Sequence, residues 1–461
     1  MSDMLSSALL SELSSFVAAR MGLHFPPERW GDLARGMASA AREKGLQDLP
    51  AYVQRLLASP LTRPEIETLA CHLTVGETYF FREKQSFEVL TGRILPDLIR
   101  SRRGGDKRLR IWSAGCCTGE EPYSIAILLD SLIPDISRWN VTILATDINP
   151  RFLDSASAGS FGEWSFRAIP AGIRERYFSP GKGGRMQIAP RIRRQVSFAF
   201  LNLAEDTYPS LVNNTSAMDV IFCRNVLMYF TPETAVRVVE KMYRTLVNDG
   251  WLLVAPSESS QVLFRNYSTV GFPDSIFYQK PTEPVRDVVA AENLPAPVVE
   301  APRIPSWPPP SEELPGVEAP VLPFSSDHDS AARRAQELAD QGKLSEARLV
   351  CDRAIAGDPV NPSHRFLRAM VEQELGMLDD AMRSLEQALY LDQVFVMAHF
   401  ALGNLGRRLG RRDVSRRHLR IALGLAQGLQ PESQLPESGG LSAGRIAELI
   451  HSMSAGEPGT R

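Results

Sequence analysis

The chain has 461 residues, which exceeds one domain of typical size and predicts about three domains. Its 44% apolar and 23% charged residues are ordinary for a globular protein. The net charge is only −3, so the composition gives no reason to expect the chain as a whole to bind nucleic acid or an anionic membrane.

The cysteines and the N-terminus narrow the class further. The five cysteines show neither metal-ligand spacing nor a disulfide framework, and no histidine cluster accompanies them. The N-terminus lacks the basic and apolar regions of a signal peptide, and the chain has no run of about 18 apolar residues. We therefore expect no metal site and a cytoplasmic protein that does not insert into a membrane.

Residues 1–85 predict an N-terminal helical domain. Apolar residues such as Phe16, Leu23, Trp30, Leu33 and Met37 recur at helical intervals, and "FPPE" and "DLP" break the pattern. The region runs into "LTVGETYFFREKQSF", residues 73–87, which holds three aromatic residues in a row. We expect these aromatics to pack the helical domain against the following domain.

Residues 86–281 predict a Rossmann-like α/β domain. Apolar, β-rich runs such as "LRIWSAG", "VTILATD", "DVIFCRN" and "WLLVAPS" alternate with amphipathic helical segments. Near-continuous apolar strands separated by helices indicate a parallel sheet that is covered on both faces. Within this domain, "RYFSPGKGGRMQIAPRIRRQVSFAF" predicts an inserted β-hairpin subdomain at about residues 176–200.

Two further regions follow the α/β domain. Residues 282–329 are rich in proline, glutamate and valine, which predicts a semi-extended linker. In residues 330–426 a 34-residue period relates Ala335, Ala369 and Gly403, and likewise Gly342, Gly376 and Gly410. This is the tetratricopeptide (TPR) period, and it predicts about three helical repeats.

Residues 427–461 form a polar tail with one short amphipathic helix. Its apolar positions are Ile446, Leu449, Ile450 and Met453. The helix is expected either to cap the repeats or to bind a partner.

The turn after the first strand carries the first chemical signal. In "IWSAGCCTGEEPYSIA" a strand passes through Gly115 and Gly119 into a helix, without the dinucleotide-binding G-x-G-x-x-G spacing. Backbone N–H groups at such a helix start attract a carboxylate or phosphate. Glu121 has two interpretations, as part of a T-x-x-E capping box with Thr118 or as a ligand-binding acid.

Two later strand ends carry polar residues. Asp147 ends the second strand, where an acid can accept ribose hydroxyls, although alone it also suits a helix N-cap. Together with the glycine turn it favours nucleoside binding. After "DVIFC", Arg224, Asn225 and Tyr229 emerge at the edge of the sheet where ligands of α/β proteins bind.

Five ordered motifs carry a family resemblance: "GETYFFRE", "IWSAGCCTGEEPYSIA", "ATDIN", "FLNL" and "FCRNVLMYF". With this order and spacing, residues 1–281 resemble the chemotaxis receptor methyltransferases of CheR type. That family transfers a methyl group from S-adenosylmethionine to glutamate side chains of methyl-accepting chemoreceptors, leaving S-adenosylhomocysteine. The added repeats resemble a subgroup that includes enzymes of surface-sensing, Wsp-like signalling pathways.

The resemblance implies a set of site residues. Arg82 and Tyr229 would be catalytic, near the transferred methyl group. The residues implied to bind the cofactor are Thr78, Arg82, Gly115, Glu121, Asp147, Asn202, Leu203, Arg224 and Asn225. Two positions depart from the family pattern: Gly76 stands where many members have Asn, and Cys117 where Ser is frequent.

The resemblance also implies partners. The substrate would be the cytoplasmic domain of a chemoreceptor, and the repeats would bind further protein partners. One alternative keeps the fold but changes the substrate to a small molecule or to RNA, against which the net acidity counts. The other is a TPR scaffold protein whose methyltransferase domain is a cofactor-dependent switch.

Overall fold

The structure of the chain is a computed structural model. It describes residues 5–105, 107–204, 208–210, 213–272, 275–282, 326–438 and 440–455. Most of the linker predicted at residues 282–329 therefore lies outside the described residues. Within the described part, no helix is both long enough and apolar enough to cross a bilayer.

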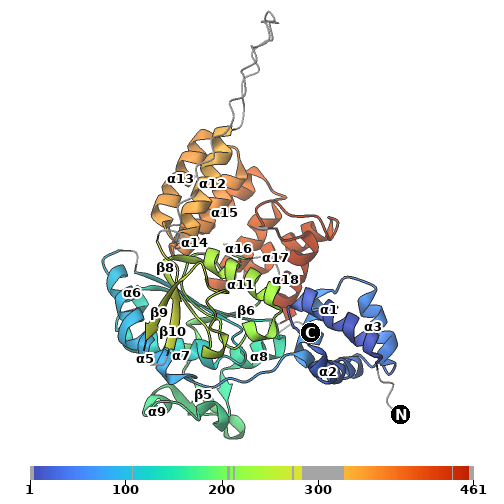
Figure 1. Cartoon of the computed structure of the whole chain (residues 1–461). Helices are drawn as coiled ribbons and strands as arrows, with labels where there is room; N and C mark the ends of the chain where they lie inside the picture. Colours follow the sequence, from blue (N-terminus) through green and yellow to red (C-terminus); the bar gives the residue numbers. More distant parts are fainter. Residues whose placement is uncertain are drawn as a thin grey trace, which may run out of the picture.

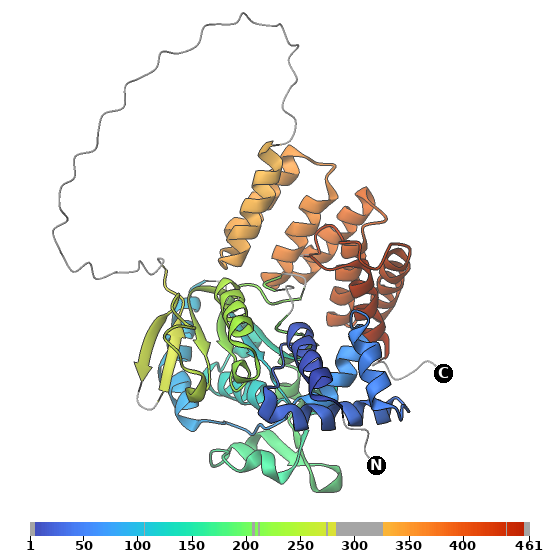
Figure 2. The same cartoon turned by 45° about the vertical axis from the view of Figure 1, so that its right-hand side comes forward.

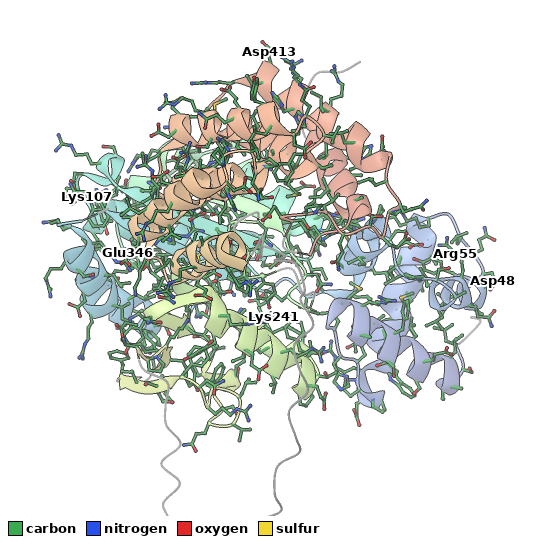
Figure 3. All side chains as sticks on the ribbon, turned by 90° about the horizontal axis from the view of Figure 1, so that it is seen from above. Asp48, Arg55, Lys107, Lys241, Glu346 and Asp413 are labelled. Carbon is green, nitrogen blue, oxygen red and sulfur yellow. The ribbon has the colours of Figure 1, made fainter. Side chains whose placement is uncertain are left out.

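Four helices form the N-terminal region and share one apolar core. Their side chains in this core include Leu13, Leu33, Met37, Val53 and Leu69, all fully or almost fully buried. Ser6, Asp48 and Thr62 precede three of the helices and supply polar N-caps. The four are α1 (Ser7–Met21), α2 (Trp30–Glu43), α3 (Leu49–Leu57) and α4 (Arg63–Leu73). Asp48, which precedes α3, and Arg55, on α3, lie at the outer edge of the molecule (Figure 3).

A seven-stranded sheet forms the centre of the molecule, with the order β6-β2-β1-β7-β8-β10-β9. The first five strands in this order are parallel, and β10 and β9 are antiparallel additions. This confirms the predicted Rossmann-like α/β architecture. The strands are β1 (Arg108–Ala114), β2 (Asn140–Asp147), β6 (Val196–Phe200), β7 (Met218–Phe222), β8 (Leu246–Leu253), β9 (Ser268–Phe272) and β10 (Ser275–Gln279).

Helices cover both faces of the sheet (Figures 1 and 2). Successive residues of a strand point to opposite faces, so Ile111 lies in one core and Trp112 in the other. The first face is covered by α5 (Lys84–Val89), a π-helical turn (Leu90–Ile94), α6 (Leu95–Arg102) and α7 (Glu120–Leu132). The second face is covered by α11 (Pro232–Thr245). Helix α8 (Pro150–Ala158) contacts β2 and β6, and its Leu153 packs against the core of the first face.

A separate three-stranded antiparallel sheet lies at one end of the molecule, and it differs from the predicted hairpin. It contains β3 (Ser160–Phe161), β4 (Phe178–Pro180) and β5 (Met186–Ile188), with α9 (Ile173–Tyr177) and α10 (Pro190–Arg193) beside it. The prediction of a subdomain at residues 176–200 was wrong at both ends. Val196–Phe200 instead pairs in parallel with β2, because the edge of the central sheet offers it a longer ladder.

Six helices form three antiparallel pairs, which confirms the predicted TPR repeats. Each pair turns at Gly342, Gly376 or Gly410, all with positive φ. The helices are α12 (Ser326–Asp340), α13 (Leu344–Gly357), α14 (Pro362–Glu374), α15 (Leu378–Leu391), α16 (Val396–Arg408) and α17 (Arg412–Gln427). The tail helix α18 (Ala443–Ala455) buries Ile446 and Ile450 in the core of the repeats, so it caps them.

The repeat module packs on the α/β domain where the strands begin. The guanidinium of Arg110, on β1, forms an ion pair with Glu374 at the end of α14, and Asn140 of β2 donates to the Glu374 carbonyl over 2.9 Å. A further contact lies at the opposite end of the sheet, where Arg445 of α18 lies over the ring of Phe200, the last residue of β6. In both cartoon views the C-terminal helices lie beside the N-terminal ones (Figures 1 and 2).

Candidate active site

A cavity of about 310 Å³ opens at the carboxyl ends of the parallel strands, a usual size for a small-molecule site. Its wall is built from the turns after β1, β2, β6 and β7 and from the segment before α5. All ten residues predicted from the sequence line it: Thr78, Arg82, Gly115, Glu121, Asp147, Asn202, Leu203, Arg224, Asn225 and Tyr229.

The turn after β1 brings the backbone close to the next strand. Gly115 has φ of 81°, and a Cβ atom there would lie 2.4 Å from Cγ2 of Val226. Only glycine fits this position without displacing Val226. The helix that follows is capped by Gly119, so of the two interpretations of Glu121 the capping box with Thr118 is not formed.

Glu121 instead takes part in an ionic network at the floor of the cavity. Its carboxylate accepts from the hydroxyl of Ser113 (2.7 Å) and from the guanidinium of Arg224 (3.2 Å). Burial raises the pKa of Glu121, and Arg224 opposes this shift. Arg224 also pairs with Glu83 at 2.8 Å and donates to the Arg82 carbonyl, so it joins the segment before α5 to α7.

Asp147 lies at the end of β2 with 8% of its surface exposed. Its carboxylate accepts from the backbone N–H groups of Cys117 and Asn149, both at 2.9 Å. Burial raises its pKa to about 6, and these hydrogen bonds limit the rise. The alternative of an N-cap is wrong, because Asn149 caps α8 and Asp147 faces the cavity.

The segment at residues 73–87 carries Thr78 and Arg82 into the cavity wall. Nη1 of Arg82 donates to the Glu77 carbonyl over 2.6 Å, and its guanidinium lies over the ring of Tyr79. Phe80 is fully buried and packs against aromatic rings of the small sheet and its adjoining turn: Phe161, Phe166 and Phe178. Phe80 therefore anchors the segment to the small sheet, and Phe81 packs against Phe87 of α5. Both lie in the core of the α/β domain and not in that of the N-terminal helices, against which the sequence suggested they would pack.

Asn202 and Leu203 form the wall next to the N-terminal helices. The Asn202 amide donates to the carbonyl of Arg20 in α1 (2.8 Å) and accepts from the N–H of Ala204 (3.1 Å). Its side chain is thus committed to holding α1 against the sheet. Leu203 is 6% exposed and offers an apolar surface to a ring system.

The turn after β7 carries Asn225 and Tyr229. Asn225 has φ of 57°, and its buried Oδ1 atom has no hydrogen-bond partner among the described residues. An unpaired buried polar atom at a cavity wall indicates a group that a ligand would satisfy. The Tyr229 side chain is partly buried, and its backbone carbonyl accepts from His24 of the N-terminal region (2.7 Å).

Glu258 was missed by the sequence reasoning. Its buried carboxylate accepts from the N–H groups of Asn225 (2.8 Å), Val226 (2.8 Å) and Met228 (3.2 Å), so it holds the whole turn. One sequence signal was available: in "WLLVAPSE" an acid closely follows a strand, as Asp147 does at the end of "VTILATD".

The cavity wall next to Gly76 is formed by Phe152 and Cys117. A Cβ atom at Gly76 would lie 2.6 Å from Cζ of Phe152 and 3.1 Å from Sγ of Cys117. Phe152 therefore occupies the space that a larger residue would need. The two positions that depart from the family pattern, Gly76 and Cys117, are in this way neighbours in space.

Comparison with known proteins adds independent information. The model of a family described as CheR methyltransferase, SAM binding domain, matches residues 76–272. The chain is 32% identical over 421 residues to the probable biofilm formation methyltransferase WspC of Pseudomonas aeruginosa, covering 87% of this chain and 96% of that protein. A WspC of Pseudomonas putida is 28% identical, covering 82% and 89%. Chemotaxis protein methyltransferase Cher2 of Pseudomonas putida is 34% identical, covering 51% and 85%.

Proposed function

The chain belongs to the CheR methyltransferase family, and from this premise we propose that it forms methyl esters on glutamate side chains of a chemoreceptor. The relatives named as chemotaxis and biofilm formation methyltransferases support a signalling role of this kind. The observation that carries the proposal is the meeting of Arg82, Glu121, Asp147 and Tyr229 in one cavity at the carboxyl ends of the strands.

S-adenosylmethionine is the cofactor of this domain family, and the cavity suits its parts. We assign the ribose hydroxyls to Asp147, the amino group to the carboxylate of Glu121, and the adenine to the apolar side of Leu203. The unpaired Oδ1 of Asn225 is an acceptor that a donor of the cofactor would satisfy. When bound, the cofactor supplies a methyl group on a sulfonium, which is a good leaving group.

The reaction requires little of the protein beyond the positioning of the two reactants. A glutamate carboxylate is ionised near neutral pH, so no general base is needed. Alignment for in-line attack can contribute roughly 7–11 kcal/mol where the geometry is near ideal. We assign this task to Arg82, which has free N–H groups besides the one bonded to Glu77, and to the hydroxyl of Tyr229.

The partner of the repeat module is proposed to be a protein. Val360 and Val394 stand 34 residues apart, at the same place in successive repeats, and are 74% and 65% exposed. Tyr390 beside them is 86% exposed. Val360 and Val394 lie in the turns between repeats and Tyr390 in the last turn of α15, away from the turns that contact the sheet. Exposed apolar patches commonly mark interfaces.

The proposed reaction is tested with labelled cofactor. Purified chain is incubated with methyl-labelled S-adenosylmethionine and with membranes that contain the receptor encoded in the same signalling system. We expect label on the receptor that is released by mild base, as glutamyl esters are, and a mass increase of one methyl group on specific glutamate residues. Label that resists base, or label found only on small molecules or RNA, would contradict the proposal.

A further inference from the structure

Helix α17, in the third repeat, carries a concentration of positive charge that the proposed function does not use. Residues 407–420, which run from the end of α16 into α17, contain seven arginines and a single acid, Asp413, within a chain of net charge −3. Arg412, Arg416 and Arg420 are spaced by four residues and share one side of the helix, with Arg417 beside them. These four residues are called the arginine face.

The arginine face is open to solvent and largely without counter-charge. All four side chains are exposed, and Arg416 is 3.8 Å from Asp413, which is itself fully exposed. Within the described part of the chain the other three form no ion pair, whereas the preceding Arg411 pairs with Asp379 at 2.8 Å. Asp413 lies at the outer edge of the molecule when it is seen from above (Figure 3).

The repeat architecture does not require arginine at these positions. Counting back by 34 residues, Arg412 corresponds to Leu378 and Leu344, and Leu344 is buried inside the module. Arg420 corresponds to Glu386 and Asp352, so the charge is reversed relative to both earlier repeats. Arg416 corresponds to Met382 and Arg348, and Arg417 to Arg383 and Leu349, so each earlier repeat carries one arginine at these positions. All four arginines occur together only in the last repeat.

We propose that the arginine face is a second docking surface for the methylated receptor, and that it binds a carboxylate-rich segment of that protein. The inference rests on the proposed function, because a substrate that presents several glutamates for methylation offers the complementary charge. Planar guanidinium groups pair with carboxylates through two parallel hydrogen bonds, and four such groups close together suit a helix that presents several carboxylates.

Other anionic partners suit the face less well. Binding of single-stranded nucleic acid uses aromatic side chains for base stacking, and α17 has no Phe, Tyr or Trp. The face also has no apolar side chain that is exposed beside the arginines to enter a lipid surface, since the exposed large apolar residues of the module lie elsewhere. An acidic protein segment needs neither feature.

The test compares the full-length chain with a variant in which the four arginines are reversed: Arg412→Glu, Arg416→Glu, Arg417→Glu and Arg420→Glu. The matched control reverses three exposed cations of the first repeat: Arg333→Glu, Arg334→Glu and Arg353→Glu. Affinity for the receptor's cytoplasmic fragment is measured without cofactor, at low and high salt. The KM for the receptor and the affinity for S-adenosylmethionine are measured in parallel.

We expect the reversed variant to bind the receptor fragment at least about tenfold more weakly than wild type at low salt, with the difference shrinking at high salt. Its KM for the receptor should rise accordingly, while cofactor affinity and melting temperature stay those of wild type. The control variant should behave as wild type.

Receptor affinity within twofold of wild type would overturn the inference. So would loss of binding to vesicles of phosphatidylserine with unchanged binding to the receptor fragment, which would assign the face to lipid. If the receptor fragment binds through the arginine face but is never methylated, the proposed function fails and the docking surface stands.

Discussion

Burial determines the charge of Asp147, and with it the pH range in which the cavity can hold its cofactor. The carboxyl group is almost enclosed, and burial raises its pKa from 3.8 to about 6. The folded chain thus holds a proton on Asp147 between these two values, where the unfolded chain does not. The stability that this proton contributes is present below 3.8 and is lost as the pH rises through about 6.

Cofactor affinity should change with pH in the opposite direction from this stability contribution, and should rise as the pH rises. Ribose hydroxyls donate best to an ionised carboxylate, so protonation of Asp147 competes with binding below its pKa. We expect affinity for S-adenosylhomocysteine, measured by calorimetry, to be about tenfold weaker at pH 5 than at pH 7. Asp147→Asn should bind weakly at both values without this pH dependence. Equal wild-type affinity at pH 5 and pH 7 would remove Asp147 from the cofactor site.

For single residues, the sequence predicts which side chains line the cavity, but it does not predict which groups of the protein they form hydrogen bonds with. Asp147, Arg224 and Asn225 were identifiable because they follow strands, and parallel strands end at one edge. The commitment of the Asn202 amide to the Arg20 carbonyl depends on how α1 packs, 182 residues away. Glu258 was missed because its role is to accept backbone N–H groups, which leaves no pattern in side-chain type.

The turn after β7 is an element whose shape depends on one carboxylate. Glu258 accepts four backbone N–H groups, three from the turn and one from Ala255. Asn225 holds a left-handed conformation within this turn, which a non-glycine residue adopts at a cost. Glu258 thus acts as a positioning residue for Asn225 and Tyr229.

Replacing Glu258 should therefore affect catalysis more than a simple loss of stability would. Glu258→Gln keeps the size but places N–H groups against backbone donors, at a cost of about 1–3 kcal/mol for each donor left unpaired. We expect kcat to fall at least tenfold, with a smaller rise in KM for the cofactor, and Glu240→Gln on the exposed side of α11 serves as the control. A lowered melting temperature with unchanged kcat would show a purely structural role.

Among the elements, the strands and repeats were predictable and the extent of the small sheet was not. Strands of the central sheet have strong apolar runs, and the repeats have a fixed period. Val196–Phe200 follows the hairpin directly in sequence and likewise alternates apolar and polar residues at first. Whether it joins the small sheet or the central one is decided by the free edge of β2, which local sequence does not reveal.

In the molecule as a whole, buried ion pairs hold the repeat module against the α/β domain. Arg108 and Arg110 of β1 are both 2% exposed, and Glu374 is the carboxylate of the module that faces them. Burial, and then the neighbouring Arg110, lowers the pKa of Arg108 to about 10. This contact lies where the strands begin, at the opposite edge of the sheet from the cavity.

Removing the Glu374 carboxylate should release the repeat module from the α/β domain and leave the cavity intact. Glu374→Ala leaves two buried guanidinium groups short of a partner, a loss of about 3–5 kcal/mol when a buried pair is broken. We expect a larger radius of gyration by small-angle X-ray scattering and wild-type affinity for S-adenosylhomocysteine. Glu386→Ala, which removes an exposed carboxylate of the same module, should change neither quantity. An unchanged radius in Glu374→Ala would show that other contacts suffice.

The sequence could not predict this docking. Arg110 and Glu374 are 264 residues apart, and neither carries a motif. The repeat period predicts that the helices pair with one another, and the α/β pattern predicts the sheet, but no local signal relates the two. The contact follows from side chains that each domain buries only when the other is present.

We propose that methyl transfer in the cavity depends on Arg82, which positions the receptor carboxylate. A single-turnover experiment with Arg82→Ala, saturating S-adenosylmethionine and purified receptor tests this assignment. We expect transfer to be slowed by at least about 100-fold, because alignment is lost, while cofactor binding stays measurable, so that the variant can still be saturated. Transfer at the wild-type rate by Arg82→Ala would contradict it.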